Sequence, residues 1–159
     1  MSIAYVALGA NLGNPVGTLN SAIDMLKSLA DTRLTASSSL YRTAPVGLHN
    51  QPDFINAVVA LDTKLTPFAL LEQLFAIEAR FGRMRTVKNA PRTLDLDLLL
   101  HGDVVCNDPQ LTLPHPRMHL RAFVLAPLAE IAAEISIPGH GPVKDMLTAC
   151  VGQKIERLP

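Results

Sequence analysis

The sequence predicts an α+β fold: a ferredoxin-like antiparallel sheet with helices packed on one face, followed by a C-terminal hairpin and further helices. The order strand, helix, strand occurs twice before residue 100, and apolar positions in the helical segments recur at helical spacing. The chain has 159 residues, of which 48% are hydrophobic and 18% are charged. Residues 1–159 therefore fit one domain with a core of its own.

The first strand–helix–strand unit is expected within residues 3–42. Residues 3–9 are nearly all apolar and lead into Gly, Asn and Pro, which predicts a buried strand and a turn. A helix is expected from Pro15 to about Asp31, because its apolar residues form one stripe: Leu19, Ala22, Ile23 and Leu26. Apolar and polar residues then alternate over 34–42, which predicts a second strand.

The second unit follows a loop at 44–53 that is rich in Pro, Gly and Asn. Residues 54–65 are rich in Val, Ile and Ala and predict a third strand. Thr66 and Pro67 have the types preferred at the N-cap and first position of a helix, and Gly82 is typical of a helix end.

The rest of the chain is expected to complete and extend this layout. A polar segment at 83–93 precedes a fourth strand at 94–100, and Gly102-Asp103 predicts a hairpin. Helices are expected at about 121–134 and 143–151.

Charge and cysteine content exclude several classes of protein. Lys plus Arg number 14 and Asp plus Glu number 14, so no overall field attracts a nucleic acid or an anionic membrane. The two cysteines, Cys106 and Cys150, form no CxxC pair, which suits a reducing compartment. No signal peptide or membrane-spanning stretch is evident. We therefore expect a cytoplasmic monomer that binds small molecules, with neither nucleic acid nor membrane as a partner.

Asp95 and Asp97 are the sharpest chemical signal. Alternate residues of a strand point to the same face, so the two carboxylates are expected to project together, opposite Leu94, Leu96 and Leu98. Two carboxylates so placed can bind one or two hard cations. An ordinary strand with a polar solvent face is the alternative. Aspartates are poor strand formers and repel each other, which favours the metal site.

A cluster of cations precedes the two aspartates: Arg80, Arg83, Arg85, Lys88 and Arg92. Carboxylates beside guanidinium groups suit a Mg²⁺-bound polyphosphate, because the metal and the arginines neutralise different phosphate oxygens. A solvated loop is the alternative. The chain has no Gly-Lys-Ser/Thr sequence, so a nucleotide would not bind in a P-loop.

Three further side chains are candidates for ligand contact. His115 lies between Pro114 and Pro116, so a rigid loop presents its imidazole either to a phosphate or ribose or to a turn. Phe54 and Phe123 begin segments flanked by polar residues and serve either as core residues or as plates for a planar ligand.

Residues 88–99, KNAPRTLDLDLL, resemble the signature of the 6-hydroxymethyl-7,8-dihydropterin pyrophosphokinase family of folate biosynthesis. Further blocks match this family in order and spacing, at 7–13, 39–47, 51–57, 78–83 and 114–125. The resemblance implies a ferredoxin-like fold and transfer of the pyrophosphoryl group of ATP to the pterin hydroxymethyl oxygen, with release of AMP.

The resemblance also implies a role for each matching residue. Asp95 and Asp97 are expected to bind two Mg²⁺ ions and, with Arg83 and Arg92, to form the catalytic group. The residues expected to contact the pterin are Thr43, Ala44, Val46, Phe54, Asn56 and Phe123. Those expected to bind ATP are Glu78, Arg85, Thr112, His115 and Arg121.

This chain departs from the family pattern at Phe75, Asn89, Ala90, Pro116 and Leu120, which concerns nucleotide contacts more than the reaction. Two other classes share parts of the pattern. A Mg²⁺-dependent nucleotidyltransferase would use the same Asp-x-Asp strand but release pyrophosphate. An RNA-binding module would need a basic face and aromatics on central strands, and the two Tyr and five Phe of this chain argue against it.

Overall fold

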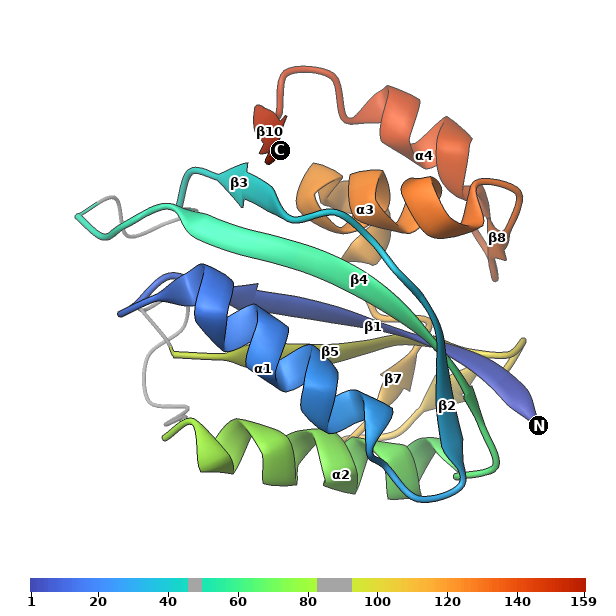
Figure 1. Cartoon of the computed structure of the whole chain (residues 1–159). Coiled ribbons are helices and arrows are strands. Elements are labelled where there is room, and N and C mark those ends of the chain that lie inside the picture. Colours follow the sequence, from blue (N-terminus) through green and yellow to red (C-terminus); the bar gives the residue numbers. More distant parts are fainter. Residues whose placement is uncertain (46–49, 83–92) are drawn as a thin grey trace.

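An antiparallel sheet with helices on both faces forms the centre of the protein (Figure 1). The computed structural model describes residues 1–45, 50–82 and 93–159. Within these residues the main sheet has six strands in the order β10-β3-β4-β1-β5, with β2 also paired to β4. The strands are β1 (Ser2–Ala10), β2 (Thr32–Ser37), β3 (Tyr41–Thr43), β4 (Phe54–Thr63), β5 (Asp95–His101) and β10 (Ile155–Arg157).

The predicted ferredoxin-like α+β layout is confirmed. β1 lies between β4 and β5, and all of these pairings are antiparallel. The β1–β4 ladder runs without interruption from Ser2 opposite Thr63 to Ala10 opposite Ile55. This continuous pairing places the ends of β1, β4 and β5 together at one end of the sheet.

The helices of the two repeated units pack on one face of the sheet. They are α1 (Pro15–Lys27) and α2 (Pro67–Arg80), and both begin with proline at the first turn. The Thr66 hydroxyl accepts a hydrogen bond from the Ala69 N–H at 3.2 Å, so the predicted N-cap is confirmed. Leu94, Leu96 and Leu98 join this core together with the apolar stripes of both helices.

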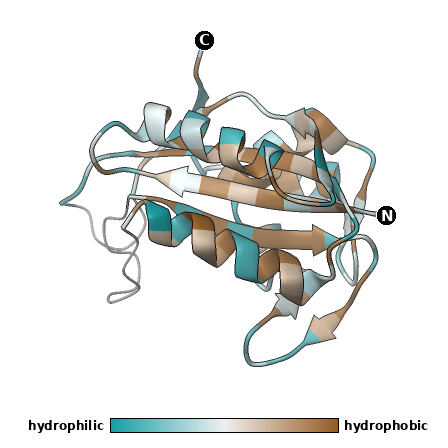
Figure 2. Ribbon diagram, turned by 60° about the horizontal axis from the view of Figure 1, so that its bottom comes forward, coloured by the Kyte–Doolittle hydropathy of each residue, from teal (hydrophilic) through white to brown (hydrophobic). Residues whose placement is uncertain are grey.

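The opposite face of the sheet is also covered by helices, whereas the sequence predicted helices on one face. Here α3 (Ala122–Ala132) and α4 (Val143–Ala149) pack in a second core around Val58, Leu99 and Leu100. β4 is buried at nearly every position, which is the pattern of a strand covered on both sides. Figure 2 agrees with this burial, because the strands are mostly hydrophobic whereas the helices carry both hydrophobic and hydrophilic residues.

The second predicted strand is divided into β2 and β3. Both strands pair with β4, and the chain between them passes Ser38. The Ser38 hydroxyl accepts a hydrogen bond from the Val58 N–H at 2.9 Å, and the Ser38 N–H donates to the Val58 carbonyl at 2.9 Å. Together these bonds keep the chain beside β4 where the regular ladder is interrupted.

The hairpin predicted at Gly102-Asp103 forms further along the chain. Gly102 turns the chain with a φ of 55°, but the hairpin pairs β6 (Cys106–Asn107) with β7 (Thr112–Leu113). A short 3₁₀ helix, η1 (Met118–Leu120), leads into α3, and a second small hairpin joins β8 (Ser136–Ile137) to β9 (Gly141–Pro142). Within the described residues, no helix is both long and apolar enough to cross a bilayer.

Candidate active site

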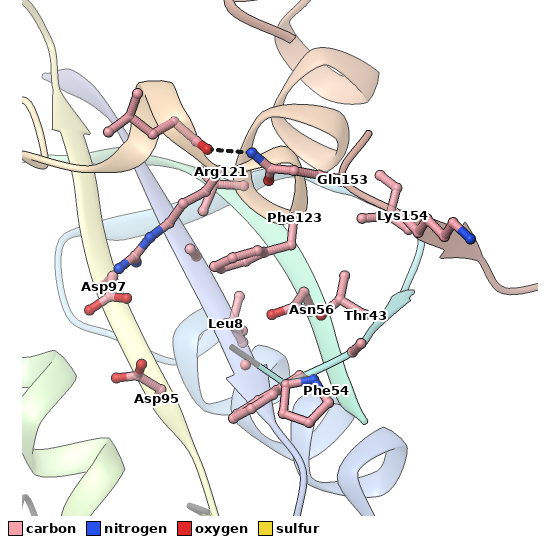
Figure 3. A pocket seen from close by; sticks show the side chains of 17 residues that line it. Leu8, Thr43, Phe54, Asn56, Asp95, Asp97, Arg121, Phe123, Gln153 and Lys154 are labelled. Carbon is pink, nitrogen blue, oxygen red and sulfur yellow. Dashed lines mark hydrogen bonds between the residues drawn. The ribbon is translucent and has the colours of Figure 1, made fainter. Parts of the chain in front are cut away.

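A cavity of about 500 Å³ opens at the end of the sheet where β1, β4 and β5 meet (Figure 3). Strand residues form its floor, the start of α3 forms one wall, and the chain leading into β10 forms another. A cavity of this size suits a small molecule that is largely enclosed by protein.

Asp95 and Asp97 both line this cavity from β5, as the alternation of the strand predicts. The leucines between and beside them are buried on the opposite face, with Leu96 only 1% exposed. The described residues contain no group of three or more His, Cys, Asp or Glu side chains that could hold a metal. A metal here would therefore need further oxygen ligands from water or substrate, which is how Mg²⁺ commonly binds in phosphate-transfer sites.

Phe54 and Phe123 come from different elements and line the same space. Figure 3 shows the Phe123 ring above it, from α3, and Phe54 below it, at the start of β4. Between the rings the cavity is open, so they are placed to stack on a flat ligand.

Polar groups occupy one side of the space between the two rings. The Asn56 amide donates a hydrogen bond to the Thr43 hydroxyl at 2.8 Å, and both side chains are buried. Gly9 lies opposite Asn56 across the β1–β4 ladder, where a Cβ would approach Asn56 Oδ1 to 3.2 Å. Ala44 lines the cavity next to Thr43. This arrangement holds the Asn56 side chain in one direction.

Arg121 enters the cavity from the start of α3. Its guanidinium carbon lies 5.5 Å from the centre of the Phe123 ring, and Figure 3 shows the side chain extending toward Asp97. The arginine therefore brings positive charge to the carboxylate side of the cavity.

A second, smaller cavity of about 220 Å³ adjoins β5 and the β6–β7 hairpin. Its lining includes Thr112, His115, Phe75 and Pro116, and Asp97 lines both cavities. Two ligands bound in these cavities would thus meet at Asp97.

His115 is held in the wall of the second cavity by its backbone. The His115 N–H donates to the Leu99 carbonyl at 2.9 Å, and Nδ1 accepts from the Arg117 N–H at 3.2 Å. Burial, and secondarily the charges of Arg121 and Arg117, lower the pKa of His115 to about 4, although Asp95 opposes this. The imidazole is therefore neutral near pH 7.

Glu78 lies behind the carboxylate strand and lines neither cavity. Its side chain is 2% exposed, and Oε2 accepts a hydrogen bond from the Leu96 N–H at 2.7 Å. The structure thus places Glu78 as a contact of β5, whereas the sequence predicted an ATP ligand. The other predicted site residues, Val46, Arg83, Arg85 and Arg92, lie outside the described residues.

The sequence reasoning missed the wall formed where the chain enters β10, at Gln153, Lys154 and Ile155. The Gln153 side chain forms hydrogen bonds with the backbone of Ala122 and Leu120, which lie 31 and 33 positions earlier in the chain. No local pattern in the sequence indicates contacts between residues so far apart in the chain.

Glu130 was also missed, and it joins α3 to the strands at the edge of the sheet. Its carboxylate accepts hydrogen bonds from Tyr41 Oη at 2.7 Å and from the Ser39 N–H, and it pairs with Arg157 at 3.6 Å. Burial alone would raise the pKa of Glu130, but the bonds from Tyr41 and Ser39 and the charge of Arg157 together lower it. Burial, together with the bond to Glu130, raises the pKa of Tyr41 to about 12. The contact fixes α3 against β3 and β10.

Two adjoining cavities that share a carboxylate are the arrangement expected of an α+β enzyme that acts on two small molecules. Comparison with known proteins narrows this class to one family. The family model for 7,8-dihydro-6-hydroxymethylpterin-pyrophosphokinase (HPPK) matches residues 5–133. The 2-amino-4-hydroxy-6-hydroxymethyldihydropteridine pyrophosphokinase of Pseudomonas aeruginosa is 47% identical over 98% of this chain and 96% of its own length. The protein of the same name from Haemophilus influenzae is 40% identical over 99% of both chains.

Solved structures show the same fold. A crystal structure of an HPPK-DHPS in complex with substrates gives a TM-score of 0.75 at 14% identity, covering 94% of this chain. The Plasmodium falciparum HPPK-DHPS with SDX-DHP gives 0.72 at 14% identity, covering 95% of this chain. The present chain spans 43% and 44% of those chains, and at this identity the likeness concerns the fold alone.

The chain belongs to the HPPK family. It is accordingly a transferase, a pyrophosphokinase that uses ATP in folate biosynthesis.

Proposed function

We propose that this enzyme transfers the pyrophosphoryl group of ATP to the hydroxymethyl oxygen of 6-hydroxymethyl-7,8-dihydropterin. The hydroxyl oxygen forms a bond to the β-phosphorus, the bond from that phosphorus to the α,β-bridging oxygen breaks, and AMP leaves. The hydroxyl proton passes to solvent. The observation that carries the proposal is that Asp97 lines both the larger cavity, which contains the two phenylalanine rings, and the smaller cavity beside His115.

The larger cavity is proposed to bind the pterin. Its two phenylalanine rings provide faces for a flat bicyclic ring, and the fixed Asn56 amide and Thr43 hydroxyl provide hydrogen bonds for its edge. The backbone near Ala44 and Val46 is proposed to complete the edge contacts. A ligand edge that carries both hydrogen-bond donors and hydrogen-bond acceptors fits this combination of groups.

Asp95 and Asp97 are proposed to hold two Mg²⁺ ions. The donor set fits this metal, because it consists of carboxylate oxygens on one face of a strand and leaves room for phosphate and water ligands. When bound, the metal neutralises charge on the phosphate oxygens.

The protein groups proposed to bind ATP lie around the second cavity and at its junction with the first. Thr112 and His115 line the second cavity, and Arg121 approaches Asp97 from the first. Arg83, Arg85 and Arg92 are proposed to act on the phosphates, with Arg83 and Arg92 stabilising the transferring group. Phosphoryl-type transfer depends mainly on alignment and charge stabilisation, so a strong general base is not required. We propose that the enzyme acts on these two small molecules as a monomer.

The test is to incubate the enzyme with ATP, Mg²⁺ and 6-hydroxymethyl-7,8-dihydropterin and to separate the products by chromatography. We expect AMP to form only when the pterin is present, in an amount equal to that of the pterin diphosphate. ADP would indicate transfer of a single phosphoryl group, and free pyrophosphate with a nucleotidyl-pterin would indicate the nucleotidyltransferase alternative. Either product in place of AMP would overturn the proposal.

A further inference from the structure

The side-chain amide of Gln153 bridges the two peptide groups on either side of Arg121. Gln153 Nε2 donates to the Leu120 carbonyl at 2.8 Å, as Figure 3 shows, and Gln153 Oε1 accepts from the Ala122 N–H at 2.9 Å. Leu120 contributes the carbonyl before Arg121, and Ala122 contributes the N–H after it. One side chain therefore holds both peptide planes that set the backbone torsions of Arg121.

Arg121 is an unfavourable residue for the position it occupies. It is the N-cap of α3, with φ −118° and ψ 110°, and no side-chain hydrogen bond caps this helix end from within. Ser, Thr, Asp and Asn are preferred at an N-cap, and positive charge at a helix N-terminus opposes the helix dipole. Gln153 supplies from another part of the chain an acceptor for the first N–H of this helix, that of Ala122.

The bridge has a consequence for the active site because Arg121 extends into the cavity. Its guanidinium lies over the Phe123 ring and is directed toward Asp97. Fixing the two peptide planes fixes the Cα–Cβ direction, and with it the region that this long side chain reaches.

The segment that carries Gln153 is held on both sides of this residue, because the Gln153 N–H donates to the Cys150 carbonyl at 3.2 Å and contacts of Arg157 follow it. Gly152 turns the chain with a φ of 97°, a conformation that favours glycine. Beyond Gln153, Arg157 donates from Nε to the Ser39 hydroxyl at 3.0 Å and pairs with Glu130 at 3.6 Å. The amide is thus presented to Arg121 by a held segment and not by a free side chain.

We propose that Gln153 is a positioning residue that directs Arg121 toward the phosphates of ATP. This inference rests on the proposed function, in which Arg121 contacts those phosphates. Gln153 is itself exposed, so its two hydrogen bonds contribute little to folding and act mainly on the geometry of Arg121.

The test is a double-mutant cycle with Gln153→Met, which keeps the length of the side chain and removes both hydrogen bonds, and Arg121→Met. Steady-state kinetics are measured with ATP and pterin varied separately, together with the thermal midpoint. Gln73→Met is the matched control, because Gln73 is exposed on α2 and lines neither cavity. We expect Gln153→Met to lower kcat/KM for ATP about fivefold, to lower kcat/KM for the pterin less than this, and to match the control in thermal midpoint.

The cycle distinguishes the possible failures. If Gln153 acts through Arg121, Gln153→Met has little further effect once Arg121 is methionine. Full additivity of the two substitutions would overturn the inference, as would equal losses for both substrates with a lowered thermal midpoint. An Arg121→Met enzyme with unchanged ATP kinetics would instead show that the proposed role of Arg121 is wrong.

Discussion

Glu78 accepts a hydrogen bond from the backbone N–H of Leu96 at 2.7 Å, so a buried carboxylate of α2 holds β5 midway between Asp95 and Asp97. β5 is the last strand in the main sheet order and pairs with β1 on one side. The contact from α2 therefore supports the strand on its other side. Groups that orient metal ligands are commonly found one layer behind them.

This relationship predicts that Glu78 affects both folding and metal affinity. In Glu78→Met the Leu96 N–H loses this acceptor, and we expect the free energy of unfolding to fall by about 2 kcal/mol. We also expect the Mg²⁺ concentration for half-maximal activity to rise about tenfold. Glu78→Gln keeps a carbonyl acceptor and should change both quantities less. Denaturant unfolding and Mg²⁺ titration of activity provide the two measurements. Equal Mg²⁺ dependence in all three proteins would contradict this role.

Asp97 is expected to be essential for turnover but not for folding. Its side chain lines both cavities on the polar face of β5, so Asp97→Ala removes a proposed metal ligand without opening the leucine core. We expect activity below about a tenth of wild type with an unchanged circular dichroism spectrum. Asp103→Ala, in the exposed turn after the same strand, is the control and should keep full activity. A variant at Asp97 that retained more than that fraction of activity would remove the metal-ligand role.

The buried Thr43–Asn56 pair is expected to control pterin affinity. Thr43→Val keeps the shape of the side chain but removes the hydroxyl that accepts from the Asn56 amide at 2.8 Å. We expect KM for the pterin to rise about tenfold because the amide is no longer held in place, while KM for ATP stays constant. Thr43→Ser retains the hydroxyl and should restore most of the affinity. Kinetics with pterin as the varied substrate distinguish the two variants, and equal effects would show that the hydroxyl is not responsible.

The carboxylate face of the site could be predicted from sequence because its pattern is local. Asp95 and Asp97 alternate with Leu94, Leu96 and Leu98, and a strand converts that alternation directly into two faces. The Thr66 cap was predictable for the same reason, since a capping residue acts within one helical turn.

The features that the sequence did not predict depend on contacts between distant segments. Glu130 meets Ser39 across 91 positions, and neither residue has a neighbour that indicates the partner. The apolar run of β4 predicts a buried strand, but a strand covered on one face by two helices and one covered on both faces can look alike in sequence. The division of the second strand at Ser38 likewise depends on the bonds it makes with Val58 of β4.

His115 is expected to act as a neutral hydrogen-bond donor. Its pKa is lowered to about 4, first by burial and then by Arg121 and Arg117, and its Nδ1 already accepts from the Arg117 N–H. The neutral ring therefore carries its proton on Nε2. Because the folded-state pKa lies below the ordinary value near 6.5, the unfolded chain binds more protons between pH 4 and 6.5. The free energy of unfolding should fall as pH is lowered through this window, by about 3 kcal/mol relative to His115→Gln. Above pH 6.5 the difference between the two proteins should not change with pH. Urea unfolding at a series of pH values measures it, and a constant difference from pH 7 to 4 would show that His115 titrates normally in the folded protein.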